Sequence, residues 1–143
     1  MKTITQSVVI SILGILLLTS CEEVSYSEVL DTKQVFTFEV KANDWQANTD
    51  HDGLNLFYSC NFKIKGLNTG VSLNRCAVLA YINFGNYEQP LPYIRHYENT
   101  FGELWTRTVD FDYSLKEVNF YVTNSDFAVE RPEKMYFRLV YIW

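Results

Sequence analysis

The sequence lacks the short motifs that mark common hydrolases and zinc proteins. It contains neither a Gly-x-Ser-x-Gly nucleophile motif nor a His-Glu-x-x-His metal motif. Its three cysteines and two histidines are scattered, and no Cys-x-x-Cys pair occurs, so the ligand spacing of a zinc site is missing. We therefore expect a protein that is not an enzyme and that needs no cofactor.

Clusters of basic residues are also missing. The chain has 12 lysines and arginines against 17 aspartates and glutamates, a net charge of −5. Phosphate-binding proteins concentrate positive charge, so we expect no nucleic-acid partner. The charge suits a soluble body that is held away from an anionic membrane surface.

No apolar run is long enough to cross a bilayer, which takes about twenty residues. The chain instead begins with Lys2 and then an apolar run of about eleven residues from Val8 to Leu18, the pattern of a secretory signal peptide. The alternative is an ordinary signal followed by a cysteine that occurs there by chance. However, Leu18-Thr19-Ser20-Cys21 resembles the bacterial lipobox. In lipobox signals the peptidase cuts just before the cysteine, which then receives fatty-acyl chains.

These features divide the chain into three parts. Residues 1–20 are expected to be a removed lipoprotein signal peptide, 21–33 a tether lipidated at Cys21, and 34–143 a single folded domain. Two or three acyl chains, each burying methylenes worth about 0.8 kcal/mol, would give a stable membrane anchor. We expect an exported protein that is anchored to the outer membrane.

The folded part alternates between apolar and polar residues. Apolar side chains recur at every second position in 36–40, 54–64, 105–113, 118–122 and 137–143. This period predicts antiparallel strands with one buried face. Residues 76–84 are apolar on both faces and suit a central strand, whereas 91–97 follow Pro90 and suit a strand near an edge.

About seven strands and no convincing helix predict an all-β fold, an antiparallel β-sandwich of immunoglobulin-like or similar Greek-key type. Turns are expected at 43–53, 66–75, 85–90, 98–103, 114–117 and 124–134. Cys60 and Cys76 lie in apolar strands of an exported chain. They either form a disulfide, which adjacent antiparallel strands would allow, or remain two buried thiols.

Four short motifs follow one another along the domain: Asn43-Asp44-Trp45, Val78-Leu79-Ala80-Tyr81, Leu91-Pro92-Tyr93 and Phe137-Arg138-Leu139-Val140-Tyr141-Ile142. Their order resembles small Bacteroidota-type lipoproteins of uncharacterised function. The resemblance implies a β-sandwich and brings no activity with it. Glu22 and Glu23 resemble the charged run that directs some of these lipoproteins to the outer face of the membrane.

One stretch matches half of a calcium loop. Asn48, Asp50 and Asp52 alternate ahead of Gly53, as in the pattern Asn-x-Asp-x-Asp-Gly. Ser59 occupies the twelfth position, where a full loop needs a bidentate glutamate. Asp-Gly before an alternating strand also predicts a hairpin turn, which is the interpretation we favour over a calcium site.

A small hydrolase or glycan-cleaving accessory is the alternative function. Asp110 and Asp112 share one face of a strand with Thr106 and Thr108, at a spacing of about 7 Å that suits two-carboxylate glycoside hydrolysis. His96 could act as a base between two tyrosines. Because nothing in the sequence predicts that burial raises the pKa of either aspartate, we favour a solvated strand face.

The favoured function uses aromatic side chains. Trp45, Phe84, Tyr87, Tyr93, Tyr97 and Trp105 fall at loops, strand ends or faces with polar neighbours. Exposed rings can stack on sugars or anchor a protein partner. For any single ring, however, burial is the interpretation we favour, with Trp45 and Trp105 closing the ends of the core. We expect a lipid-anchored module that binds a glycan or a protein, or that has a structural role.

Overall fold

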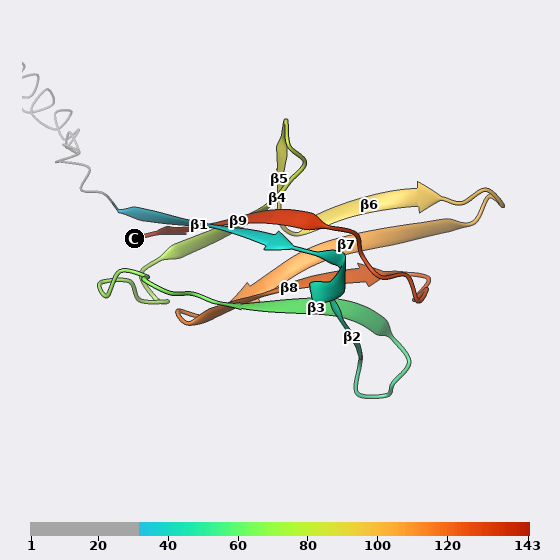
Figure 1. Ribbon diagram of the computed structural model, residues 1–143, viewed down its shortest axis with the longest axis horizontal. Helices are drawn as coiled ribbons and strands as arrows, with labels where there is room; N and C mark the ends of the chain where they lie inside the picture. The colour runs from blue at the N-terminus through green and yellow to red at the C-terminus, as the bar shows by residue number, and fades with distance from the viewer. Residues whose placement is uncertain (1–31) are drawn as a thin grey trace, which may run out of the picture. The chain divides into compact units, whose positions relative to one another are not determined.

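The structure of the protein is a computed structural model that describes residues 32–143 (Figure 1). The predicted signal peptide, the predicted lipidation site Cys21 and nearly all of the predicted tether lie outside the described residues. Within residues 32–143, no helix is long and apolar enough to cross a membrane. The elements are β1 (Lys33–Val40), η1 (Ala42–Asp44), β2 (Gln46–Thr49), β3 (Leu56–Lys63), β4 (Ala77–Asn83), β5 (Glu88–Pro90), β6 (Tyr93–Glu98), β7 (Leu104–Tyr113), β8 (Glu117–Asn124) and β9 (Met135–Ile142).

Two antiparallel sheets confirm the predicted all-β sandwich. One sheet has the strand order β1-β9-β4-β5 and the other has β2-β3-β8-β7-β6. The strand at 76–84 is internal, as predicted, because β4 lies between β9 and β5. The strand at 91–97 is at an edge, as predicted, because β6 ends the five-stranded sheet.

The structure has nine strands where the sequence predicts about seven. The two additional strands, β2 and β5, lie in segments predicted as turns. Both are short edge strands of four and three residues. Pairing with β3 and β4 forms them, because their own residues carry no apolar alternation.

The core lies between the sheets and is built on aromatic rings. Phe120 of β8 and Phe137 of β9 stack across the two sheets with ring centroids 4.1 Å apart. Phe38 and Phe62 pack against the same Phe120 ring. All these residues belong to the described unit, which therefore contains its own hydrophobic core, the property expected of a domain.

The fold begins slightly earlier than the predicted Gln34. β1 starts at Lys33, and the backbone N–H of Trp143 donates to the carbonyl of Thr32 at 2.8 Å. The carboxyl-terminal strand β9 lies between β1 and β4 and pairs with both along most of its length.

The disulfide interpretation of the cysteine pair is not realised, because Cys60 and Cys76 are both free thiols. A bridge between adjacent antiparallel strands required both residues to lie in one sheet. Cys60 is instead in β3, whereas Cys76 directly precedes β4 in the other sheet. Burial, together with the nearby Asp44 carboxylate, raises the pKa of the Cys60 thiol, so this thiol stays protonated in the core.

Candidate functional site

The β6–β7 hairpin extends beyond the four-stranded sheet (Figure 1). On its inner face the register pairs Tyr93 with Val109, Arg95 with Arg107, and Tyr97 with Trp105. Val109 is fully buried, whereas Tyr97 is 36% exposed. The face that forms core at Val109 is therefore open to solvent nearer the tip. We call Tyr93, Arg95, Tyr97, Trp105 and Arg107 the aromatic shelf.

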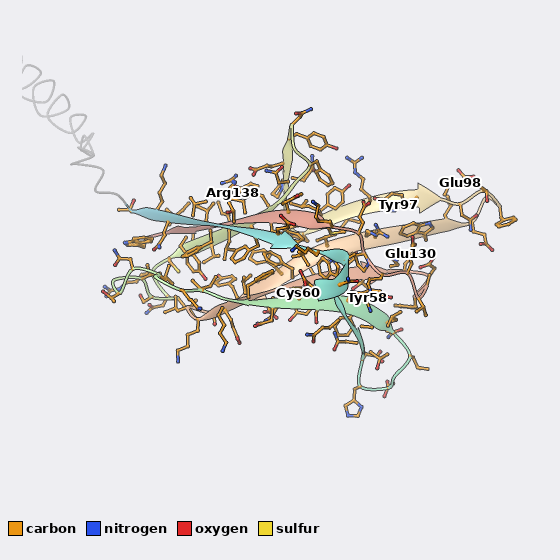
Figure 2. The ribbon with its side chains drawn as sticks, in the orientation of Figure 1. Tyr58, Cys60, Tyr97, Glu98, Glu130 and Arg138 are labelled. Atoms are coloured by element: carbon orange, nitrogen blue, oxygen red, sulfur yellow. The ribbon has the colours of Figure 1, made fainter. Side chains whose placement is uncertain are left out.

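The centre of the shelf is a stacked pair of rings. Tyr97 and Trp105 lie with centroids 4.4 Å apart and an interplanar angle of 15°. The guanidinium carbon of Arg107 is 5.2 Å from the centre of the Trp105 ring. Arg107 Nε donates to Oδ1 of the buried Asn124 at 3.0 Å. These contacts hold the rings and the guanidinium in place before any ligand arrives. Figure 2 shows Tyr97 on this hairpin, with Glu98 closer to its tip.

More rings reach the shelf from the turn between β4 and β5. Phe84 lies 5.5 Å from Tyr93 and stacks on Tyr87 at 5.0 Å. Phe84 and Tyr87 are both well exposed. Tyr93 Oη accepts a hydrogen bond from Arg95 Nε at 3.0 Å. The aromatic surface therefore continues from the hairpin to the four-stranded sheet.

A small cavity opens between the two groups of rings. It has a volume of about 100 Å³ and is lined by residues that include Phe84, Tyr93, Tyr97 and Arg107. Burial, and then the neighbouring Tyr93, raises the pKa of Tyr97. The Tyr97 hydroxyl is therefore neutral at physiological pH and can both donate and accept a hydrogen bond.

Trp45 does not belong to this surface. Its side chain is only 1% exposed, and its ring packs edge-on against Phe137 at 6.3 Å. Nε1 donates to the carbonyl of Glu133 at 3.2 Å. Trp45 closes the core, which was the alternative considered for it, and it offers no ring face to a ligand.

The two aspartates of the alternative function lie on the outer face of the five-stranded sheet. Asp112 accepts hydrogen bonds from Asn119 Nδ2 at 2.5 Å and from Tyr121 Oη at 2.7 Å. Burial, followed by the Asp112 hydrogen bond and charge, raises the pKa of Tyr121 to about 12. Because both neighbours donate to it, the Asp112 carboxylate acts as a hydrogen-bond acceptor at this site.

The expectation that burial leaves both aspartates unperturbed is wrong for Asp110. Desolvation, with a smaller contribution from the Asp112 charge, raises the pKa of Asp110. The sequence pattern did not indicate this, because the outer face of a strand is ordinarily well solvated. Here Asp110 pairs directly with Tyr121 of β8, and this bulky cross-strand neighbour limits its contact with water.

His96 is separated from the tyrosines beside it in the sequence. The alternation of β6 places its side chain on the outer face, opposite Tyr93 and Tyr97. Its Nδ1 lies 2.9 Å from Thr106 Oγ1. His96 therefore does not share a face of the strand with Arg95 and the two tyrosines.

The half calcium loop forms a hairpin turn between β2 and β3. Asp50 Oδ1 accepts hydrogen bonds from the backbone N–H groups of Leu54 and Asn55, and these hydrogen bonds lower the pKa of Asp50. Asn48 Nδ2 donates to Ser59 Oγ at 2.8 Å. Within residues 32–143, no cluster of three acidic, histidine or cysteine side chains is placed to hold a metal ion. The residues around Asp50 are thus engaged in closing the turn.

The structure brings together Tyr93, Tyr97 and Trp105 from the predicted ligand-binding set, and it links Tyr87 to them through Phe84. It also adds Arg107, which the sequence interpretation did not select. A hairpin centred on residue 101 would have indicated it, because that register sets position 107 opposite Arg95. Comparison of the chain with protein-family models, with curated proteins and with solved structures found no match.

Proposed function

We propose that this protein is a non-enzymatic, exported module that is lipid-anchored through Cys21 and binds a glycan on the aromatic shelf. The observation that carries the binding proposal is the stacked, partly exposed Tyr97–Trp105 pair on the hairpin that extends beyond the four-stranded sheet. Large aromatic rings usually bury their surface. A rigid, partly exposed pair of aromatic rings is typical of a surface that binds a ligand.

The chemistry of the shelf suits a sugar. The C–H groups on one face of a pyranose ring are apolar and pack on flat aromatic rings, while its hydroxyls need hydrogen-bond partners. The shelf supplies both, because Tyr93, Tyr97 and the two arginines lie around the rings. Side chains fixed by stacking lose little entropy when the ligand binds.

A protein ligand is the second candidate. Tyrosine, tryptophan and arginine are the residue types most enriched at binding hot spots, and the shelf consists only of tyrosine, tryptophan and arginine. A protein partner would also need a contact area of about 800 Å² on each side. Such a footprint would extend beyond the shelf to the turn that carries Tyr87.

The test is glycan binding by residues 22–143, measured by isothermal titration against a panel of soluble polysaccharides. We expect Tyr97→Ala to weaken binding by about fivefold, since an aromatic contact contributes about 1 kcal/mol beyond its buried area. Tyr113→Ala is the matched control, because Tyr113 lies in the same sheet and is similarly exposed, at 38% against 36% for Tyr97. Uniformly blank titrations, or equal losses in the two variants, would contradict the proposal.

The alternative hydrolase remains a separate hypothesis, and the raised pKa of Asp110 favours it. It predicts that shorter sugars accumulate when the protein is incubated with the same polysaccharides, and that Asp110→Asn abolishes them. The binding proposal predicts no such products and unchanged affinity in Asp110→Asn. Chromatography of the incubated polysaccharides distinguishes the two functions.

A further inference from the structure

Two arginines face each other on the shelf. Arg95 of β6 and Arg107 of β7 are direct cross-strand partners on the inner face of the hairpin. Side chains in such positions have Cβ atoms about 5 Å apart, and like charges placed there destabilise the sheet. A pair of this kind in a chain with a net charge of −5 calls for a compensating negative group.

No carboxylate of the described chain provides that group. The ion pairs within residues 32–143 are His51–Asp52, Lys134–Glu39 and Arg138–Glu88, and none of them includes Arg95 or Arg107. Arg138 shows the contrast, because Glu88 binds its guanidinium through both carboxylate oxygens.

Neutral groups orient both shelf arginines instead. Arg107 Nε donates to the side-chain amide oxygen of Asn124, and Arg95 Nε donates to the hydroxyl of Tyr93. Among the described residues, these are the hydrogen bonds that the two guanidinium groups make, so their terminal nitrogens keep donors for a ligand. Paired terminal N–H groups match the two oxygens of a carboxylate or a sulfate.

We propose that Arg95 and Arg107 bind an anionic group, carboxylate or sulfate, on the glycan whose ring packs on the Tyr97–Trp105 pair. This inference rests on the proposed function and specifies its ligand class as an acidic polysaccharide. The anion relieves the repulsion between the two arginines, and the rings set the position of the sugar. Neutral glycans make the stacking contact and ordinary hydrogen bonds, without the charge-assisted pair.

The experiment compares matched pairs of polymers by titration with residues 22–143. Polygalacturonate is set against its methyl ester, and dextran sulfate against dextran. Poly-glutamate serves as an acidic peptide. The variants are Arg107→Gln and Arg95→Gln, with Arg75→Gln as a control that removes the same charge from an exposed loop. Arg107→Lys and thermal melting of every variant separate loss of binding from loss of folding.

We expect at least one acidic polymer to bind about tenfold more tightly than its neutral partner, the effect of one charge-assisted hydrogen bond. Arg107→Gln and Arg95→Gln should remove the difference in affinity between the acidic polymer and its neutral partner, and Arg75→Gln should leave that difference unchanged. Tighter binding of polygalacturonate would identify the anion as a carboxylate, and tighter binding of dextran sulfate would identify it as a sulfate. Raising the salt concentration should weaken only the acidic interaction.

Two results would overturn the inference while glycan binding stands. One is equal affinity for acidic and neutral partners with no loss in Arg107→Gln. The other is poly-glutamate binding as tightly as the acidic polysaccharides, which would show recognition of charge alone. Failure of every polysaccharide to bind would overturn the proposed function together with the inference.

Discussion

At the scale of single residues, Phe120 is the buried side chain of one sheet that packs directly against the other sheet. It is fully buried and contacts the rings of Phe38, Phe62 and Phe137. We expect Phe120→Ala to lower the free energy of unfolding by about 3–5 kcal/mol, because it removes buried area and leaves a cavity. Urea denaturation measures the change. Leu104→Ala, at a residue 78% exposed, should change the stability by less than about 0.5 kcal/mol.

We expect the contribution of Asp110 to folding stability to depend on pH with a sign opposite to that of most aspartates. Its pKa is raised in the folded state, so its contribution to stability is fully present below the unfolded pKa, near 3.9, and is lost as the pH rises through the folded pKa. Asp110→Asn should therefore be more stable than wild type at pH 7, and the gain should disappear below about pH 3.9. Melting curves at pH 3 and pH 7 check this.

The control for this pH experiment is Asp52→Asn, because the Asp52 side chain is 79% exposed in the β2–β3 turn. It should melt like wild type at both pH values. An Asp110→Asn variant that is less stable than wild type at pH 7 would mean that the charged carboxylate makes a favourable contact in the native state. That result would weaken the hydrolase hypothesis, because the raised pKa of Asp110 is the observation that favours it.

The tryptophans show how far single residues could be interpreted from the sequence. For both Trp45 and Trp105 the sequence interpretation favours the core, with a binding surface as the alternative. Local pattern cannot separate them, because burial depends on whether the opposite sheet covers each position. Trp45 lies under that cover, and Trp105 is on a hairpin that extends past it.

At the scale of elements, β5 is a three-residue edge strand that its own sequence does not specify. Glu88 joins it to β9 through Arg138, whose guanidinium carbon also lies 4.3 Å from the centre of the Tyr81 ring. Arg138, chiefly through its hydrogen bond, lowers the pKa of Glu88. The ion pair therefore stabilises the fold above the unfolded pKa of Glu88, near 4.3, and this stability is lost as the pH falls through the folded pKa.

We expect Glu88→Gln to lower stability at pH 7 by about 1 kcal/mol, a value suited to a partly exposed ion pair. Amide hydrogen exchange should accelerate first in β5, because the loss of the pair frees an edge rather than the core. Glu130→Gln, in the exposed segment before β9, is the control. Unchanged exchange in β5 would mean that backbone pairing with β4 is sufficient to hold it.

Element prediction succeeded where one face of a strand is buried. Period-two alternation located β1, β3, β7, β8 and β9, because an exchange of faces would expose rows of phenylalanine to water. A run that is apolar on both faces located the internal strand β4. It missed β2 and β5, where pairing partners rather than side chains decide the conformation. It also missed the Arg95–Arg107 pair, which depends on the register between two strands and not on either strand alone.

At the scale of the whole molecule, anchoring at Cys21 is an independent proposal. Replacing Cys21 by serine should release the exported protein from the membrane fraction, because the acylated side chain is lost. Cell fractionation followed by mass spectrometry of the amino-terminal peptide checks both location and acylation. Cys76→Ser is the matched control and should leave the protein in the membrane fraction. A Cys21→Ser protein that stays with the membrane would contradict the anchor.

Binding on the aromatic shelf is tested most directly by the indole N–H signals of the three tryptophans. Trp45 is in the core, Trp143 ends the chain, and Trp105 is on the shelf. Titration of ¹⁵N-labelled residues 22–143 with polygalacturonate, dextran sulfate and their neutral partners should shift the Trp105 signal and leave those of Trp45 and Trp143 in place. Binding that leaves the Trp105 signal unmoved would show that the ligand lies elsewhere on the protein.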